Sequence, residues 1–492
     1  MTRDAPTGEA PATSPLPPVP EEDVDRRAAE IVLRLAPGRG VPDPRILSLV
    51  AEAPPPAPPA VWTDSDAAVL TAVYAARVRR DALLEESSLL TRYFDGVHLG
   101  RPGTLSSGVR SQLYAAAGEY GIAVGQPRIA ASFGQQALLF ADSDRLRYRA
   151  LSVAALGHAL NGEYLSAEAD LIEAEEIFDR LGWPEAETAQ LVLLAHVLVA
   201  SAWLDEERLL RAAHRMRCAQ PDDAYWQFSA RAAEVMAQMF RRDYAAALAD
   251  CRLLLNGRRR HRSNRVTHDL LVCMSSDILV AQGEHQAALA ALHPHGSPPG
   301  HGVCFSMQRS AALLALGREE ELLSETAACV AEPDHCLRTL TPVLVRRSLA
   351  WSRLGSPRRA RNAMESALLL IARTGFSATP FLMLPHDESR GIVDAVIAQN
   401  ADLASAAPRF REMLARVTTP DAPSSRRSRA ASFTPSERAL AALLATPLRH
   451  ADIARERGVS VNTVKSQLRS IYRKLGVGNR AEAVERLRDV GL

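Results

Sequence analysis

Turn-forming residues recur along the middle of this chain at intervals of roughly 34 to 43 residues. Between them the sequence is rich in alanine, leucine and arginine at helical spacing. This period is typical of helix-pair solenoids, in which one unit cannot bury its own apolar face and must stack on its neighbours. The sequence therefore predicts an array of about seven helical pairs. The predicted turns lie at Gly125, Gly162, Asp205, Asp243, Gly283, Gly317 and Gly355.

Several of these turns are followed by a pattern that resembles a tetratricopeptide repeat. Gly162 leads to Ala167, and Asp243 leads to Ala247, so that a small residue stands in the second helix of each pair. Small residues let paired helices approach closely. We predict a tetratricopeptide-like sensor or interaction domain over residues 61–417, and an irregular helical bundle is the alternative.

The regions that flank this array differ in composition. Residues 1–60 are rich in proline and alanine, which predicts a largely disordered region with one possible short helix at Glu21–Leu35. Thr63 and Asp66 then form the start signal of a longer helix. Residues 418–432 are polar and predict a linker before a separate domain at 433–492.

The charge of the chain is unevenly distributed. The net charge is +1, but from residue 433 onward eleven Lys and Arg stand against six Asp and Glu. A local excess of positive charge is typical of a nucleic-acid module. The two lysines of the chain are Lys465 and Lys474, so no Walker A or kinase-type lysine can occur upstream. No catalytic constellation is evident, and we predict neither an enzyme nor a bound cofactor.

The six cysteines are scattered without a CxxC pair, which indicates buried thiols in a reducing compartment. With no signal sequence and no apolar run of membrane-spanning length, we expect a cytoplasmic protein without a membrane partner. Imidazoles and thiols fall close together between residues 293 and 304 and could hold zinc, but their spacing matches no metal motif. We therefore predict a flexible loop and no metal site. The residues concerned are His293, His295, His301 and Cys304, with His335 and Cys336 further on.

The last sixty residues predict four short helices. Thr434 and Glu437 can form a capping box at the start of the first, which carries an inward stripe of leucines. The second covers roughly His450 to Arg457 and ends at Gly458, which can adopt the left-handed conformation of a helix C-cap. Because two residues separate it from the third helix, this pair predicts a helix-turn-helix.

The third helix is amphipathic. Its apolar residues recur at alternating spacings of three and four, which predicts that one face packs on the first two helices. The opposite face is cationic and rich in hydrogen-bond donors, and such a helix fits the DNA major groove. The apolar residues are Val461, Val464, Leu468, Ile471 and Leu475, and the polar face consists of Asn462, Lys465, Ser466, Arg469 and Arg473 with Thr463, Ser470 and Lys474 beside them.

The run from Asn462 to Val477 resembles the DNA-binding domain of LuxR (GerE-type) transcription regulators, and in particular their MalT-like branch. The resemblance implies a four-helix domain that binds DNA through its third helix and pairs with a second copy through its fourth. It differs from many members in having glutamine, not histidine, at Gln467. The resemblance implies base contacts by Lys465, Ser466 and Arg469, phosphate contacts by Asn462, Thr463, Arg473 and Lys474, and a dimer helix with Ala483 and Leu487.

Together these features predict an all-α protein, with a tetratricopeptide-like solenoid followed by a four-helix LuxR-type helix-turn-helix domain. The expected function is that of a sequence-specific transcription regulator. Its partners would be double-stranded DNA, bound as an inverted repeat by a homodimer, and a protein, peptide or small-molecule effector at the repeats. The alternative is a helical-repeat scaffold or adaptor that is localised to DNA.

Overall fold

A computed structural model describes most of the chain. The described part is almost entirely helical, in agreement with the predicted fold class. No helix within it is long and apolar enough to span a bilayer. The described residues are 44–80, 88–256, 265–293, 295–297, 301–417, 440–441, 443–444, 448, 450–457, 459–475, 480 and 483–484, with the side chains of 44, 80, 456 and 473–475 excepted.

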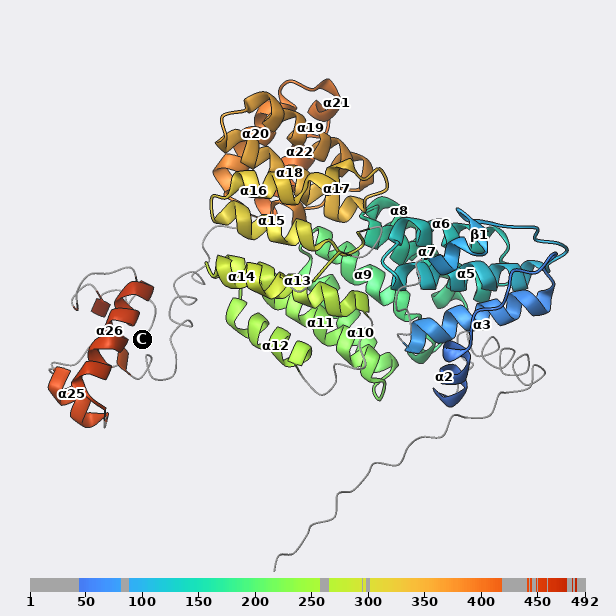
Figure 1. Cartoon of the computed structure of the whole chain (residues 1–492), viewed down its shortest axis with the longest axis horizontal. Helices are drawn as coiled ribbons and strands as arrows, with labels where there is room; N and C mark the ends of the chain where they lie inside the picture. The colour runs from blue at the N-terminus through green and yellow to red at the C-terminus, as the bar shows by residue number, and fades with distance from the viewer. Residues whose placement is uncertain are drawn as a thin grey trace, which may run out of the picture.

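The middle of the chain consists of consecutive antiparallel helices (Figure 1). The N-terminal helices are α2 (Pro44–Glu52), α3 (Asp64–Arg80) and α4 (Ser88–Thr91). Seven pairs follow: α5 (Ser107–Ala123) and α6 (Pro127–Leu139), α7 (Asp144–Asn161) and α8 (Tyr164–Arg180), α9 (Gln190–Ala202) and α10 (Glu206–Ala219), α11 (Ala224–Phe240) and α12 (Tyr244–Asn256), α13 (Arg265–Ala281) and α14 (His285–Leu292), α15 (Phe305–Ala315) and α16 (Glu319–Glu325), and α18 (Leu337–Arg353) and α19 (Pro357–Thr374). The remaining helices of this region are α17 (Ala327–Ala331), α20 (His386–Ile397), α21 (Ala401–Ala404) and α22 (Ala407–Val417), with short 3-10 turns at Glu185–Glu187 and Thr379–Phe381.

All seven predicted turns lie between the two helices of a pair, and all seven share one backbone geometry. One residue of each turn is left-handed, and the N–H of the next residue donates to the carbonyl five positions back, as in Glu163 to His158 (2.9 Å). This is the Schellman motif, which satisfies helix-end carbonyls that would otherwise lack partners. The left-handed residues are Gly125, Gly162, Leu204, Arg242, Gly283, Gly317 and Gly355.

Two of these left-handed positions carry side chains, which costs about 1–2 kcal/mol each relative to glycine. Both side chains contact the end of the array. Leu204 packs against the apolar cluster built from residues 345–414, and Arg242 donates to the carbonyl of Val417 (3.1 Å). These contacts offset the backbone strain.

The array folds back on itself, so that its last helices contact its earlier turns. The N–H of Ala378 donates to the carbonyl of Ala202 (2.7 Å), and Arg416 donates to the carbonyl of Trp203 (3.3 Å) while its guanidinium lies 5.0 Å from the Trp203 ring. Gly162 lies against Arg338, where a Cβ would come within 2.7 Å of the Arg338 nitrogen. The superhelix is therefore held by contacts across more than 170 residues, as well as by neighbouring pairs.

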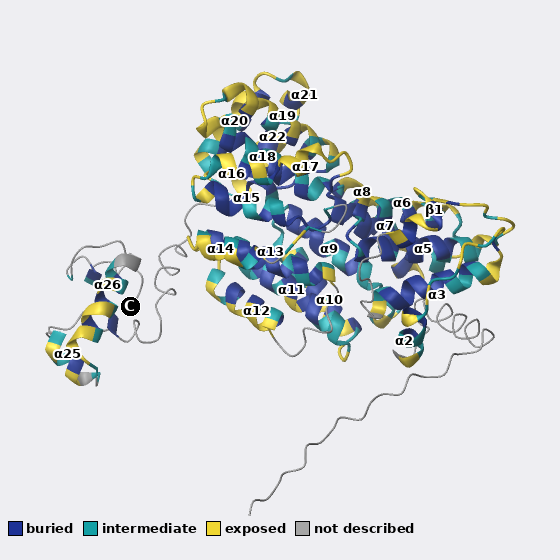
Figure 2. Ribbon diagram, viewed as in Figure 1, coloured by how far each residue is buried: buried dark blue, intermediate teal, exposed yellow. Residues whose placement is uncertain are grey.

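Helices α6 and α7 pack closely against one another. A Cβ at Gly134 would lie 2.5 Å from the backbone nitrogen of Ala154, and one at Gly157 would lie 2.5 Å from that of Ala131. The two backbones approach closely because neither glycine carries a side chain. Figure 2 shows the consequence, since α7 is buried along most of its length.

In the N-terminal part, the structure agrees with the predicted helix cap but contains elements that the sequence did not predict. Thr63 and Asp66 form the predicted cap, with the Asp66 N–H donating to the Thr63 hydroxyl (3.2 Å). The possible helix at 21–35 and the linker at 418–432 lie outside the described residues. Helix α2 and a two-residue hairpin, β1 (Phe94–Asp95) with β2 (His98–Leu99), were not predicted. Both are too short to show a clear period, and tertiary packing on α3 stabilises α2.

Candidate nucleic-acid interface

Two helices of the C-terminal domain form a helix-turn-helix. They are α25 (His450–Glu456) and α26 (Val461–Leu475), close to the predicted bounds. The Val459 N–H donates to the carbonyl of Ala454 (3.0 Å), a bond between residues five apart that is typical of a Schellman helix end. Gly458, the predicted C-cap, lies between them but outside the described residues. The short connection fixes the direction in which α26 leaves α25.

The start of α26 is capped by its own sequence. The Ser460 hydroxyl accepts a hydrogen bond from the Thr463 N–H (3.0 Å) and lies 2.8 Å from the Thr463 hydroxyl. A serine at this position satisfies an N–H that has no partner within the helix. Thr463, which is predicted to contact a phosphate, is half-buried, and its N–H is already engaged in this cap.

One face of α26 is buried in a small apolar core. Val464 and Ile471 are 0% exposed and Leu468 is 3% exposed, as the periodicity predicts, whereas Val461 in the first turn of the helix is 38% exposed and does not join the predicted apolar face. They pack with Ile453 of α25 and with residues of the first and fourth predicted helices. Since these contacts hold the rotation of α26 about its axis, they determine which side chains face outward.

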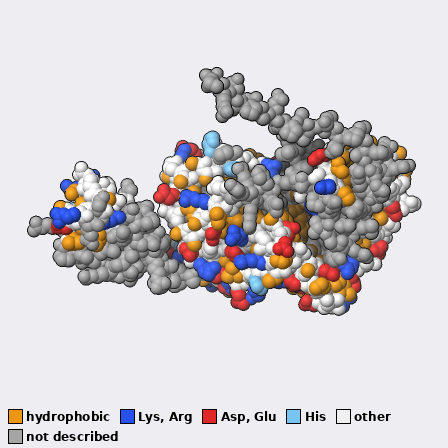
Figure 3. Space-filling view, turned by 90° about the horizontal axis from the view of Figure 1, so that it is seen from below, with side chains coloured by type: hydrophobic (Ala, Val, Ile, Leu, Met, Phe, Trp, Pro, Cys, Tyr) orange, Lys and Arg blue, Asp and Glu red, His pale blue; other side chains and the backbone are white. Residues whose placement is uncertain are grey.

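The opposite face of α26 is open to solvent. Asn462, Lys465, Ser466 and Arg469 are all exposed. At about 3.6 residues per turn, these four positions lie within a sector of roughly 100°. Several cationic side chains are visible on the described surface of this domain (Figure 3). The side chains of Arg473 and Lys474, which the sequence also places on or beside this face, lie outside the described residues.

Two polar residues brace the domain in ways that sequence patterns did not indicate. Gln467 accepts a hydrogen bond from Arg457 at the end of α25 (2.9 Å), and this bond ties the two helices of the motif together. Arg480 donates to the carbonyls of Leu444 (3.2 Å) and Leu448 (2.7 Å). These hydrogen bonds join residues ten or more positions apart in the sequence, so no local sequence pattern predicts them.

The predicted dimer helix is described only in part. Ala483 is completely buried within the domain's own core, where its small side chain leaves room for α26. Its methyl group is thus already packed within a single chain, and a contact with a second copy would require other residues of this helix. Leu487 lies outside the described residues, so the dimer contact stays a prediction.

Comparison with known families agrees with this geometry. The family described as bacterial regulatory proteins, luxR family (GerE), matches residues 431–487. Residues 431–487 are a LuxR-family helix-turn-helix domain. The family is one of DNA-binding transcription regulators and not of enzymes. The match begins two residues before the predicted boundary at 433 and includes α25, α26 and part of the predicted fourth helix.

The helical array was compared with solved structures. The chain is similar to the structure titled "Crystal Structure of Rap Protein Complexed with Competence and Sporulation Factor", at 13% sequence identity and a TM-score of 0.46. The similarity covers 72% of this chain and 99% of that one. No curated protein matches the chain.

Proposed function

We propose that the protein is a sequence-specific transcription regulator that places α26 in the DNA major groove. The observation that carries this proposal is the division of α26 into a buried face with Val464 and Leu468 and an exposed face with Lys465 and Arg469. The LuxR-family match to the same segment supports it. A major groove about 12 Å wide accepts an α-helix with its side chains.

Within this proposal, Lys465, Ser466 and Arg469 read base edges. Lysine and arginine can donate to the O6 and N7 atoms of guanine, and a serine hydroxyl can donate or accept. Asn462 and Thr463, at the start of the helix, are placed to approach phosphates together with Arg473 and Lys474. Phosphate contacts set position on the duplex, whereas base contacts set sequence preference.

We expect the protein to bind an inverted repeat as a homodimer, with half-sites centred about 10 bp apart. Selection of bound genomic fragments by the purified full-length chain, followed by footprinting, tests both the activity and the symmetry of the site. Protection of a two-fold sequence supports the proposal. Failure to enrich any sequence over bulk DNA would contradict the proposal of sequence-specific binding.

Binding should also depend strongly on salt. Each phosphate neutralised by a lysine or arginine releases condensed counterions, so a dimer with about 6–10 such contacts should lose about 10³–10⁵ in affinity between 50 and 200 mM salt. Fluorescence anisotropy at several salt concentrations gives the slope. An affinity that hardly changes with salt would contradict cationic contacts to the backbone.

We further propose that the helical array at 61–417 senses a protein, peptide or small molecule and controls the DNA-binding domain. An effector can do this only if it binds one of two states more tightly than the other. Small-angle scattering and DNA affinity of the full-length chain should both change when the effector is added. Promoter activity that survives deletion of residues 433–492 would instead favour a scaffold or adaptor.

A further inference from the structure

The structure assigns a tetrahedral zinc site to His301, Cys304, Cys329 and His335 in the helical array. The four potential ligand atoms, two imidazole nitrogens and two thiol sulfurs, all lie within 4.8 Å of one another. A set of two cysteines and two histidines is a common composition for structural zinc. This assignment is independent of the DNA-binding function and departs from the expectation, drawn from the sequence, that the region holds no metal.

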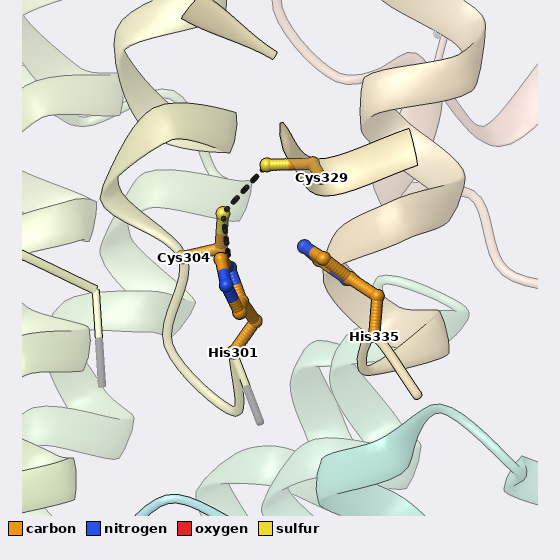
Figure 4. A group of neighbouring side chains, drawn as sticks. All are labelled: His301, Cys304, Cys329 and His335. Atoms are coloured by element: carbon orange, nitrogen blue, oxygen red, sulfur yellow. Dashed lines mark hydrogen bonds between the residues drawn. The ribbon is translucent and has the colours of Figure 1, made fainter. Parts of the chain in front are cut away.

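The four side chains converge from two segments of the chain (Figure 4). His301 and Cys304 belong to the loop that enters α15, and Cys304 is the N-cap residue of that helix. Cys329 belongs to the short helix α17, and His335 to the loop that enters α18. A bound ion would therefore join the sixth helical pair to the seventh.

The separations between the potential ligand atoms agree with those around a tetrahedral zinc ion. With Zn–S bonds of about 2.3 Å and Zn–N bonds of about 2.0–2.1 Å, tetrahedral angles place two sulfurs about 3.8 Å apart and a sulfur and a nitrogen about 3.6 Å apart. The two Sγ atoms of Cys304 and Cys329 are 3.7 Å apart, and Nδ1 of His301 is 3.5 Å from Sγ of Cys304. A disulfide would require the two sulfurs at about 2.05 Å.

The hydrogen bond of His335 orients its imidazole so that Nε2 can bind a metal ion. Its Nδ1 lies 3.0 Å from the carbonyl oxygen of Cys336, and because a carbonyl only accepts, Nδ1 must carry the proton. In the neutral imidazole Nε2 then bears a lone pair, and this atom is buried without a hydrogen-bond partner. A histidine that binds a metal through one nitrogen usually donates its other N–H to a carbonyl or carboxylate in this way.

The surroundings also suit a thiolate at Cys304. The Met307 N–H donates to its Sγ (3.3 Å), and three of the four residues are almost completely buried, with Cys304 at 0%, Cys329 at 1% and His335 at 3% exposure. A zinc ion with two thiolates and two neutral imidazoles has no net charge. Such a group can be buried without the cost of an isolated charge.

The backbone at His301 is strained, and strained backbone conformations are common at functional sites. His301 has a φ of +54°, which a residue with a side chain seldom adopts. The Thr339 hydroxyl donates to its carbonyl (2.9 Å), and the neighbouring Gly302 N–H donates to the carbonyl of Gly125 (3.2 Å) in the first helical pair. The site therefore lies beside a contact between the loop that enters α15 and the turn of the first helical pair.

The sequence indicates only part of this set. Its spacing places His301 and Cys304 near His293 and His295, and His335 beside Cys336, but carries no signal for Cys329. In the structure His295 stacks on Phe305 at 5.1 Å, and the Cys336 thiol donates to the carbonyl of Leu160 (3.1 Å). His301 and His335 instead face one another, with ring centroids 4.3 Å apart.

The test uses the full-length chain purified under reducing conditions without chelators. We expect about one zinc ion per chain by elemental mass spectrometry, since the four ligands complete one coordination shell. After removal of zinc, titration with Co²⁺ should produce the ligand-field bands of tetrahedral cobalt and a thiolate-to-cobalt charge-transfer band. Saturating Zn²⁺ should raise Tm, because it binds the folded state preferentially.

Variants identify the ligands. Cys329→Ser and His335→Gln should each weaken Zn²⁺ binding by at least ~100-fold, more than the ~10–100-fold typical of a lost second-shell partner. Cys251→Ser is the matched control, since it alters a buried thiol of α12 outside the cluster and should leave binding unchanged. Circular dichroism reports whether each variant folds, and cobalt spectra of the wild-type chain decide the question if one does not.

Several outcomes would overturn the assignment. One is a folded wild-type chain that binds neither Zn²⁺ nor Co²⁺ at a one-to-one ratio. Others are a cobalt spectrum without thiolate charge transfer, full binding by Cys329→Ser, or equal loss in Cys251→Ser. Mass spectrometry of freshly purified protein that finds Cys304 and Cys329 joined in a disulfide would also exclude a resident ion.

Discussion

Arg469→Ala and Lys465→Ala are each expected to weaken binding to the cognate duplex by roughly 10- to 100-fold, which follows from about 1–3 kcal/mol for each good base contact. Both side chains are exposed on α26, on the face opposite its buried core. Truncating them removes donors without disturbing the packing of the domain. Binding to a scrambled duplex should change much less.

The two duplexes separate base contacts from phosphate contacts. Arg473→Ala should weaken binding to both sequences by similar factors, since phosphates are present in each. Arg390→Ala, an exposed arginine of α20 in the helical array, removes the same charge and should have little effect. Gel-shift titrations of each variant on both duplexes give these ratios. Equal losses on both duplexes for Lys465→Ala would show that it does not read bases.

Gly134→Val should destabilise the helical array by at least about 2–3 kcal/mol, near the upper part of the range for overpacked cores. Its side chain would meet the nitrogen, Cα and Cβ of Ala154 at 2.5–2.9 Å, so α6 and α7 would have to separate. A flexible side chain could move aside, but a helix backbone cannot do so without losing its other contacts.

Gly391→Val is the matched control for this experiment. Gly391 lies in α20, is exposed, and has no atom within 4 Å of the position that a Cβ would occupy. Valine is also a better helix former than glycine, so this variant should be neutral or slightly stabilised. Urea unfolding followed by circular dichroism compares the two. A Gly134→Val chain as stable as the wild type would show that the array repacks at this contact.

The turns illustrate what local sequence can predict. Five of the seven left-handed residues are glycines, and a glycine between two helical patterns indicates a helix end because it alone adopts this conformation at little cost. Leu204 and Arg242 were located because an aspartate follows each of them, not because of their own conformational preference. Their left-handed backbones are stabilised by contacts with residues 345–417, which no local pattern contains.

In the C-terminal domain, too, the sequence predicted local features but not the contacts between distant residues. The alternation of apolar and cationic residues on α26 correctly predicted that Val464 is buried and Lys465 exposed. The hydrogen bonds of Gln467 and Arg480 were missed, since each joins residues ten or more positions apart. The roles of the exposed residues toward DNA remain predictions that the binding experiments address.

The sequence by itself determined the helical character of the array, the seven turns within its helical pairs and the amphipathic face of α26, because each depends on residues a few positions apart. Only the tertiary structure decided that the last helices return to the early turns. It also brought Cys329 to His301, across 28 residues with no recognisable ligand spacing. The reason is physical: small rotations between successive pairs add up along a solenoid, and their sum determines which distant side chains meet.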